Sequence, residues 1–341
     1  MNRKTRLHRQ MPAAAGGWSR RQALHGLGAG LLAAGVPVAV SGQERRRLHF
    51  LIPAASGGGW DQTARAVAES LTRTRLVDTV TFEHLSGEGG GRAIAYMVAT
   101  AERQQGTLMV SSTPIVLRAV RGAAKSTYHE LTPIAALIGD YAAIAVRSDS
   151  PHRDFASLAA AVKRDPSSTK VAGGSVRGGM DHLVAVRAFS LAAGVNPLNV
   201  VYYPYDADGE AFDALLAGQT EALATGLGEL VASPRRGEIR ILAISAPERV
   251  PEVPDAPTMR ELGHDVTFVN WRGFFGPPNL PAAVAASHAG LLADLNRSPD
   301  WAEVRRRYAW QPLYHSGAEF AAFLAAEEAT ARQVLASLEL I

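Results

Sequence analysis

Residues 48–71 read LHFLIPAASGGGWDQTARAVAESL, and this stretch decides the fold class. Its first six residues form a short apolar run, which predicts a buried strand. From Asp61 to Thr74, apolar residues recur at helical spacing, so we expect a helix there. A glycine-rich turn joins the two. The stretch therefore predicts the strand–loop–helix unit of an α/β protein.

The same alternation continues along the chain. Helical patterns separate further short apolar runs, which we predict to be strands. These runs are residues 79–84, 107–112, 142–147, 170–174, 199–203, 221–225 and 240–245. Such alternation predicts α/β architecture with largely parallel sheets. The final stretch, residues 281–341, is predicted to be mostly helical.

The chain has 341 residues, which is long enough for two packed lobes. The chain would leave the first lobe after residue 145 and return near 270, through FVNWRGFFGPPNLP (268–281). Lobe 1 would then be residues 43–145 plus 270–341, and lobe 2 would be residues 146–269. Two crossings make a hinge, and two hinged lobes form a cleft suited to closing on a ligand.

The N-terminus has the pattern of an export signal. Residues 1–42 hold six bases and no acid, residues 23–40 are apolar and small, and Ala39-Val40-Ser41 is a small-x-small cleavage pattern. This layout predicts a signal peptide and a periplasmic location. An uncleaved anchor is the weaker interpretation, because a membrane span needs roughly 20 strongly apolar residues. SRRQAL (19–24) resembles the twin-arginine signal but departs from it at Ala23.

Charge and cysteine content exclude several functions. Without the six leader bases, acids outnumber bases in the chain, so no basic face predicts a nucleic-acid partner. The chain has no cysteine, which excludes disulfides, thiolate metal sites and a lipid anchor at a lipobox. HELTP (129–133) has proline where a zinc-protease helix needs its second histidine. We therefore predict no metal, no cofactor and no enzymatic activity.

Two glycine-rich loops follow predicted strands of lobe 1. They are SGGGWD (56–61) and SGEGGGR (86–92). Glycine lets backbone N–H groups approach a ligand, and a helix N-terminus favours an anion. Both loops lie at the carboxyl ends of strands, where open α/β sheets bind ligands. A plain flexible turn, with Asp61 as helix cap, is the alternative interpretation.

A third loop, GGSVRGGMDH (173–182), follows a strand of lobe 2. It offers backbone donors, the Ser175 hydroxyl and Arg177, but Arg177 replaces the second glycine of a nucleophile elbow. Asp181 and His182 are adjacent on the expected helix, so they do not face each other. We predict that Asp181 caps the helix and that His182 packs under the loop. In the next strand, alternation predicts that one of Tyr202 and Tyr203 is buried.

These segments together resemble the substrate-binding component of tripartite tricarboxylate transporters, the Bug family. The matching segments, in order, are PAASGGGWDQTAR, GEGGGRA, YHELTPIAAL, GGSVRGGMDHL, YYPYDADGEA, LLAGQTEAL, PTMREL and NWRGFFGPP. The resemblance implies a two-lobed periplasmic-binding-protein fold of the type II kind. It also implies a small organic acid in the cleft, delivery to integral-membrane transporter subunits, and a monomer.

The resemblance implies a set of ligand-binding residues. They are Gly58, Gly59, Trp60, Asp61, Gly89, Gly90, Gly91, Ser112, Thr113, Ser175, Gly178, Gly179 and Asp206. Arg177 departs from the family pattern. One hypothesis is that it pairs with a ligand carboxylate, and the other is that it is a solvated loop arginine.

Rival functions stay open from the sequence alone. A ligand-loaded sensor partner for a two-component system fits the same features, and a periplasmic hydrolase or isomerase would need a catalytic pair that the motifs do not reveal. The carboxylate could be a tricarboxylate, a dicarboxylate, an acidic amino acid or an aromatic acid, because backbone amides bind any of them.

Overall fold

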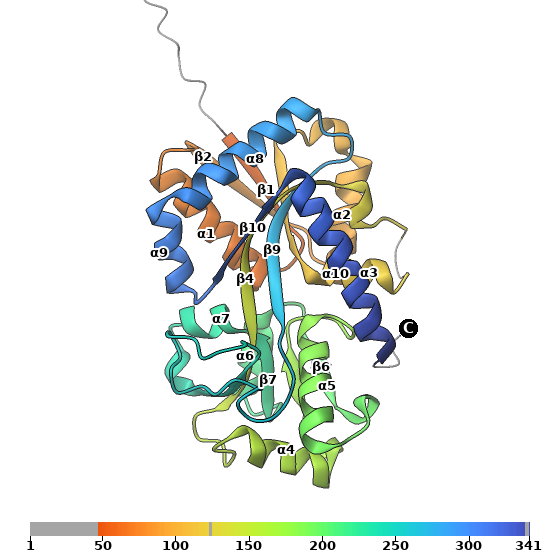
Figure 1. The fold of residues 1–341 in the computed structure, drawn as a ribbon, viewed down its shortest axis with the longest axis vertical. Helices are drawn as coiled ribbons and strands as arrows, with labels where there is room; N and C mark the ends of the chain where they lie inside the picture. The colour runs from red at the N-terminus through yellow and green to blue at the C-terminus, as the bar shows by residue number, and fades with distance from the viewer. Residues whose placement is uncertain (1–46, 123–124, 338–340) are drawn as a thin grey trace, which may run out of the picture. The chain divides into compact units, whose positions relative to one another are not determined.

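The computed structural model describes residues 47–122, 125–337 and 341, which belong to one compact unit. Figure 1 shows how its helices and strands are arranged. The predicted signal peptide, residues 1–42, lies outside the described residues.

The first lobe is built on a mixed sheet. Its strands are β1 (Arg47–Ile52), β2 (Thr79–His84), β3 (Thr107–Ser112), β9 (Val269–Gly276), β10 (Gln311–Ser316) and the first part of β4 (Thr132–Arg147). Strand β1 pairs in parallel with β2 and β3, whereas β9 runs antiparallel between β3 and β4. All six residues of β3 are buried, because the strand lies inside the sheet with helices on its faces.

The second lobe continues from the same long strand. Its strands are β5 (Val171–Gly173), β6 (Tyr202–Pro204), β7 (Ala222–Gly226), β8 (Ile239–Ile244) and the second part of β4. Strand β5 is parallel to β6 and β7, and β4 is antiparallel to β7 and β8. Strand β4 thus runs through both lobes (Figure 1). The boundaries near 145 and 270 stay predictions, and they fall within β4 and β9.

Helices cover both sheets. Those packed with the first lobe are α1 (Gly59–Arg73), α2 (Gly91–Ala99), α3 (Thr113–Val120), α8 (Ala282–Arg297), α9 (Pro299–Arg307) and α10 (Gly317–Ser337). Those of the second lobe are α4 (Phe155–Arg164), α5 (Met180–Ala193), α6 (Asp208–Leu216) and α7 (Leu227–Ala232). In α1 the apolar residues share one face and are buried, which is why this amphipathic segment is helical.

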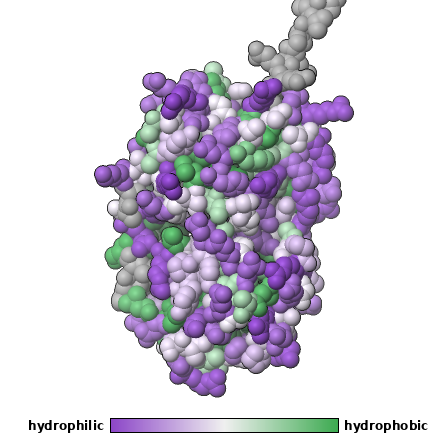
Figure 2. Space-filling model, turned by 180° about the vertical axis from the view of Figure 1, so that it is seen from behind, coloured by the Kyte–Doolittle hydropathy of each residue, from purple (hydrophilic) through white to green (hydrophobic). Residues whose placement is uncertain are grey.

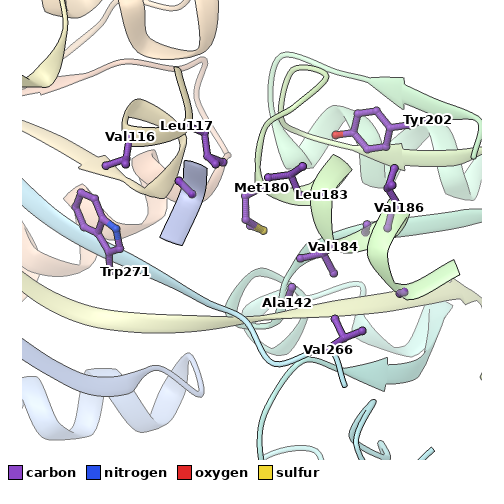
Figure 3. Packing of buried hydrophobic residues seen from close by; sticks show 14 of the residues in the cluster. Val116, Leu117, Ala142, Met180, Leu183, Val184, Val186, Tyr202, Val266 and Trp271 are labelled. Carbon is purple, nitrogen blue, oxygen red and sulfur yellow. The ribbon is translucent and has the colours of Figure 1, made fainter. Parts of the chain in front are cut away.

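One apolar cluster joins the two lobes. It contains Val116 and Leu117 of α3, Trp271 of β9, and Met180 and Leu183 of α5, and Figure 3 shows these side chains around the crossing strands. Continuous apolar packing across the crossing explains why the described residues form a single unit.

The structure corrects two predictions. The two sheets are mixed, since the central strands β4 and β9 are antiparallel to their neighbours. Residues 268–281 were interpreted as a lobe crossing and no strand was predicted there, yet residues 269–276 form the buried strand β9. The prediction that the C-terminal stretch is mostly helical is confirmed by α8, α9 and α10, and the stretch also contains strand β10.

On the face of the molecule seen in Figure 2, hydrophilic residues predominate and apolar ones are scattered. Among the described helices, none combines the length and apolarity needed to cross a bilayer.

Candidate ligand-binding site

A cavity of about 130 Å³ lies where the loops of the two lobes meet. That volume has room for roughly ten water-sized atoms. Its walls come from the loops after β1, β2 and β3 in the first lobe and from the loops after β5 and β6 in the second. Asn270 and Arg272 of β9 also line it. The cavity is therefore sized for a small molecule.

Four helices begin at this cavity. The N-cap residues are Gly58 for α1, Ser112 for α3, Gly179 for α5 and Ala207 for α6, and all four line the cavity. First-turn N–H groups of a helix have no intrahelical acceptor and carry partial positive charge. In the described part of the chain, no N-cap side chain accepts a hydrogen bond from these four helices. The first turns of α1 and α3 are thus available to an anionic group, with Pro114 of α3 offering no N–H. In α5 the Asp181 N–H already donates to Ser175 Oγ.

Local contacts hold the first-lobe loops in place. The Trp60 Nε1–H donates to Ser112 Oγ at 2.8 Å, which ties the start of α1 to the start of α3. Gly90 has φ +90°, and a Cβ there would lie 3.3 Å from the Trp60 ring. Glycine at this position therefore allows both the left-handed backbone and the close approach of Trp60.

Arg118 supplies a cation on the same side. Its Nη2 donates to Glu88 Oε2 at 2.8 Å, and its Nη1 donates to the Glu88 carbonyl. Its Nε is buried and has no acceptor among the described residues. Gly91 makes room for this guanidinium, because a Cβ at Gly91 would collide with it.

Two hydrogen bonds cross the rim of the cavity from lobe to lobe. Ser86 Oγ donates to Asp206 Oδ2 at 2.6 Å. Arg121 Nη1 donates to the carbonyl of Arg177 at 2.6 Å. These contacts bring the two walls together around the cavity.

A buried ionic cluster forms the floor. Arg272, 2% exposed, donates from Nη2 to Asp140 Oδ2 at 2.8 Å and to Glu229 Oε1 at 2.9 Å. Its Nη1 donates to the carbonyl of Gly59 and to Thr63 Oγ1. Arg272 thus fixes the start of α1 to β4 and α7. A buried charge needs such partners, because its desolvation costs several kcal/mol.

The carboxyl groups of the cluster hold protons more tightly than free ones. Burial raises the pKa of Asp140 to about 6, although Arg272 opposes the shift. Burial, and next the neighbouring Asp208, raise the pKa values of Asp181 and Glu229 well above the usual range.

Nine of the predicted ligand-binding residues line the cavity. They are Gly58, Gly59, Trp60, Gly89, Ser112, Ser175, Gly178, Gly179 and Asp206. The structure brings these residues of both lobes around one space. Their contact with a ligand stays a prediction.

The other five lie outside the lining. Gly90 and Gly91 stand behind it, next to Trp60 and Arg118. Thr113 is buried at the start of α3. Arg177 is exposed and donates from Nη2 to the Tyr202 carbonyl at 2.8 Å.

Asp61, the fifth, faces away from the cavity and supports the glycine loop. Its carboxylate accepts hydrogen bonds from the Gly57 N–H, from Ser56 Oγ and from Arg65 Nε, and pairs with His84 Nε2 at 2.8 Å. Burial alone would raise the pKa of Asp61, but these bonds together lower it. The interpretation of Asp61 as helix cap is wrong, because the N-cap is Gly58.

The prediction that Asp181 caps α5 is also wrong. The N-cap is Gly179, and the Asp181 N–H donates to Ser175 Oγ at 3.0 Å. The carboxyl of Asp181 instead belongs to the floor of the cavity. The prediction for the tyrosines is confirmed, since Tyr202 is buried and Tyr203 is exposed.

His182 packs under the third loop, as predicted, and its Nδ1 accepts a hydrogen bond from the Gly178 N–H at 3.0 Å. The ring must be neutral at Nδ1 to accept. Burial, and then Arg177 and Arg121, lower the pKa of His182 to about 4. The neutral ring of His182 thus contributes fully to the stability of the fold at pH values above about 6.5, the ordinary imidazole pKa. This contribution is lost as the pH falls through about 4.

We expect the ring of His182 to titrate with a midpoint near pH 4. NMR of ring-labelled protein measures this, and a His182→Asn variant identifies the resonance. A midpoint close to 6.5 would contradict the buried, loop-supporting role.

Sequence reasoning missed the charged floor and the arginines of the wall. The missed residues include Arg118, Arg121, Asp208, Glu229, Asn270 and Arg272. Asp208 and Arg272 stood within segments that carried the family resemblance, so they could have been proposed. Arg118 and Glu229 lie on helix faces with no local signal. In residues 47–122 and 125–337, no group of three or more His, Asp or Glu side chains is arranged to hold a metal ion.

Comparison with known proteins decides the family. The family model "Tripartite tricarboxylate transporter family receptor" matches residues 63–340. The chain belongs to this receptor family. Family members are periplasmic solute-binding proteins, and the two-lobed α/β fold agrees with that class.

Relatives of the receptor are distant in sequence but similar in fold. A UPF0065 protein of Agrobacterium vitis is 26% identical over 73% of this chain and 71% of its own length. The periplasmic binding protein BugD has a TM-score of 0.77 at 23% identity, over 86% of this chain and 98% of BugD. MatC from Rhodopseudomonas palustris, solved with bound malate, has a TM-score of 0.71 at 25% identity, over 85% of this chain and 99% of MatC.

Proposed function

We propose that this receptor captures a small organic carboxylate in the periplasm and delivers it to the membrane subunits of a tripartite tricarboxylate transporter. The observation that carries the proposal is the first-lobe wall of the cavity. There the uncapped starts of α1 and α3 meet the guanidinium of Arg118.

This wall suits a carboxylate for physical reasons. Helix N-termini offer N–H donors and partial positive charge. A carboxylate accepts up to four hydrogen bonds, and bonds to an ionised group are about twice as strong as neutral ones. The buried Nε–H of Arg118 is a further donor, and it has no acceptor among the described residues.

Two further facts support a small acid as cargo. The cavity, with a volume of about 130 Å³, suits a compact molecule. MatC, a relative of the same fold, was solved with malate. The predicted signal peptide in residues 1–42 supports the periplasmic location, and the family supports the transporter as partner. Binding without chemistry is consistent with the absence of a recognised catalytic motif in the sequence.

A thermal-shift screen of organic acids tests the function. A true ligand present at 100 times its dissociation constant should stabilise the protein by about 2.7 kcal/mol. Each acid should be paired with its neutral amide, which has nearly the same shape. We expect the acid to stabilise the protein and the amide to do so far less. Equal shifts for acid and amide, or no shift with any carboxylate, would contradict the proposal.

A further inference from the structure

The two sides of the cavity carry opposite charge. The first-lobe side has Arg118, which is paired with Glu88, together with Arg121 and the starts of α1 and α3. On the second-lobe side, Asp181 and Asp208 stand in the first turns of α5 and α6, and Glu229 lies on α7. All three of these acidic residues line the cavity. The starts of α5 and α6 are thus already offset by their own acids.

Of the three acids on this side, Arg272 forms an ion pair only with Glu229. Its Nη2 is shared between Asp140 and Glu229, and its Nη1 bonds to Gly59 and Thr63. No hydrogen therefore remains on those two nitrogens for Asp181 or Asp208, and the buried Nε–H of Arg272 has no acceptor among the described residues. Four carboxyl groups surround one cation.

The contacts of Thr225 show that the cluster is short of donors. Thr225 Oγ1 lies 2.9 Å from Asp208 Oδ1 and 2.8 Å from Glu229 Oε2. A hydroxyl has one proton, so it can donate to only one of them. The other contact needs a proton on a carboxyl group. Without a ligand, this wall must hold at least one extra proton.

Two buried acceptor oxygens at the cavity, one on α5 and one on β9, have no donor in the described residues. They are Asp181 Oδ1 and Asn270 Oδ1. Asp181 is 2% exposed and Asn270 is 4% exposed, and both line the cavity. A buried acceptor without a donor costs about 1–3 kcal/mol. A proton held between Asp181 and Asp208 serves the first atom without a ligand, and a ligand with N–H donors would serve both.

We propose that the ligand carries an ammonium group as well as a carboxylate, and that Asp181, Asp208 and Glu229 bind the ammonium. The inference rests on the proposed function, which puts the carboxylate at α1, α3 and Arg118. An ammonium supplies three donors and a positive charge, so it replaces the shared proton and satisfies the unpartnered acceptors. The substrate class is a short amino acid, of about three to five carbons for a cavity of this size.

Isosteric series of acids test the proposal directly. The C4 series is succinate, malate and L-aspartate. The C3 series is propionate, lactate and L-alanine, and the C5 series is glutarate, 2-hydroxyglutarate and L-glutamate. Within a series the members differ in one group, which is hydrogen, hydroxyl or ammonium. Titration calorimetry on the protein should give, in at least one series, an amino member that binds about tenfold tighter or more than the other two.

The variant Asp208→Asn tests the assigned residues, and Asp181→Asn is the second variant if the first folds poorly. Asparagine keeps an oxygen for Thr225 and removes one of several like charges, so the fold should persist. We expect the preference for the amino member over the unsubstituted acid to fall about tenfold. Asp149→Asn is the matched control, because Asp149 is exposed and pairs only with Arg147 at the surface; it should change nothing.

The outcomes distinguish a failure of the ammonium site from a failure of the proposed carboxylate-binding function. If unsubstituted or hydroxy acids bind as tightly as amino acids in every series, or if Asp208→Asn keeps the preference, the ammonium site is wrong and carboxylate binding stands. If no acid of any series binds, both the ammonium site and the carboxylate function are contradicted.

Discussion

Replacing Arg272 with methionine is expected to lower the free energy of unfolding by about 3–5 kcal/mol. The change removes the cation that pairs with Asp140 and Glu229 and leaves both carboxyl groups in the interior. It also removes the bonds to the Gly59 carbonyl and Thr63 that fix the start of α1. Urea unfolding followed by circular dichroism measures the loss.

Matched variants separate charge pairing from packing. Arg235→Ala removes an exposed arginine that pairs with Asp213 and Glu238, and it should lower the free energy of unfolding far less than Arg272→Met does. Adding Asp140→Asn and Glu229→Gln to the methionine variant should recover much of the stability, because the two carboxyl groups that paired with Arg272 are then replaced by neutral amides. A loss below about 1 kcal/mol for Arg272→Met alone would contradict the role given to the cluster.

Replacing Gly59 with alanine is expected to weaken both stability and ligand binding. A Cβ at this position would fall against Glu229 Oε1 and Arg272 Nη2, and would lie 2.7 Å from Arg272 Cζ. These neighbours are buried and bonded, so they cannot move aside cheaply. Overpacking of this kind costs about 1–3 kcal/mol. Displacing the start of α1 should also lower carboxylate affinity about tenfold, the value of one charge-assisted hydrogen bond.

Gly290→Ala is the control for this variant. Gly290 lies inside α8, and a Cβ there has open space. Alanine should leave binding unchanged and stabilise the helix by up to about 1 kcal/mol. Unfolding and calorimetry of both variants make the comparison. Equal behaviour of the two would show that the close packing around Gly59 does not matter.

Strands with local apolar patterns could be predicted from the sequence. Strands β1, β2 and β3 lie at or within one residue of the predicted ranges, because buried strands leave continuous apolar runs. Strand β9 was missed, since its buried residues include Asn270 and Arg272, which find their partners on other elements. Strand β10 contains Pro312 and is only partly buried, so it carries little of the usual signal.

The loops of the site could be predicted better than its charges. Glycine-rich turns after strands are local features, and those at Gly58, Gly89 and Gly178 do line the cavity. The floor joins Asp140, Glu229 and Arg272, which are separated by 43–132 residues. Their proximity follows from β4, α7 and β9 meeting in space, which no local pattern expresses. The charged floor of the cavity therefore depends on the tertiary structure.

A crystal structure of the protein with the tightest carboxylate from the screen tests the central claim most directly. The account predicts the ligand in the cavity, with a carboxylate oxygen within about 3.2 Å of an N–H at the start of α1 or α3 and the carboxylate next to Arg118. A ligand bound elsewhere, or held in the cavity with its carboxylate away from both helix starts and from Arg118, would contradict it.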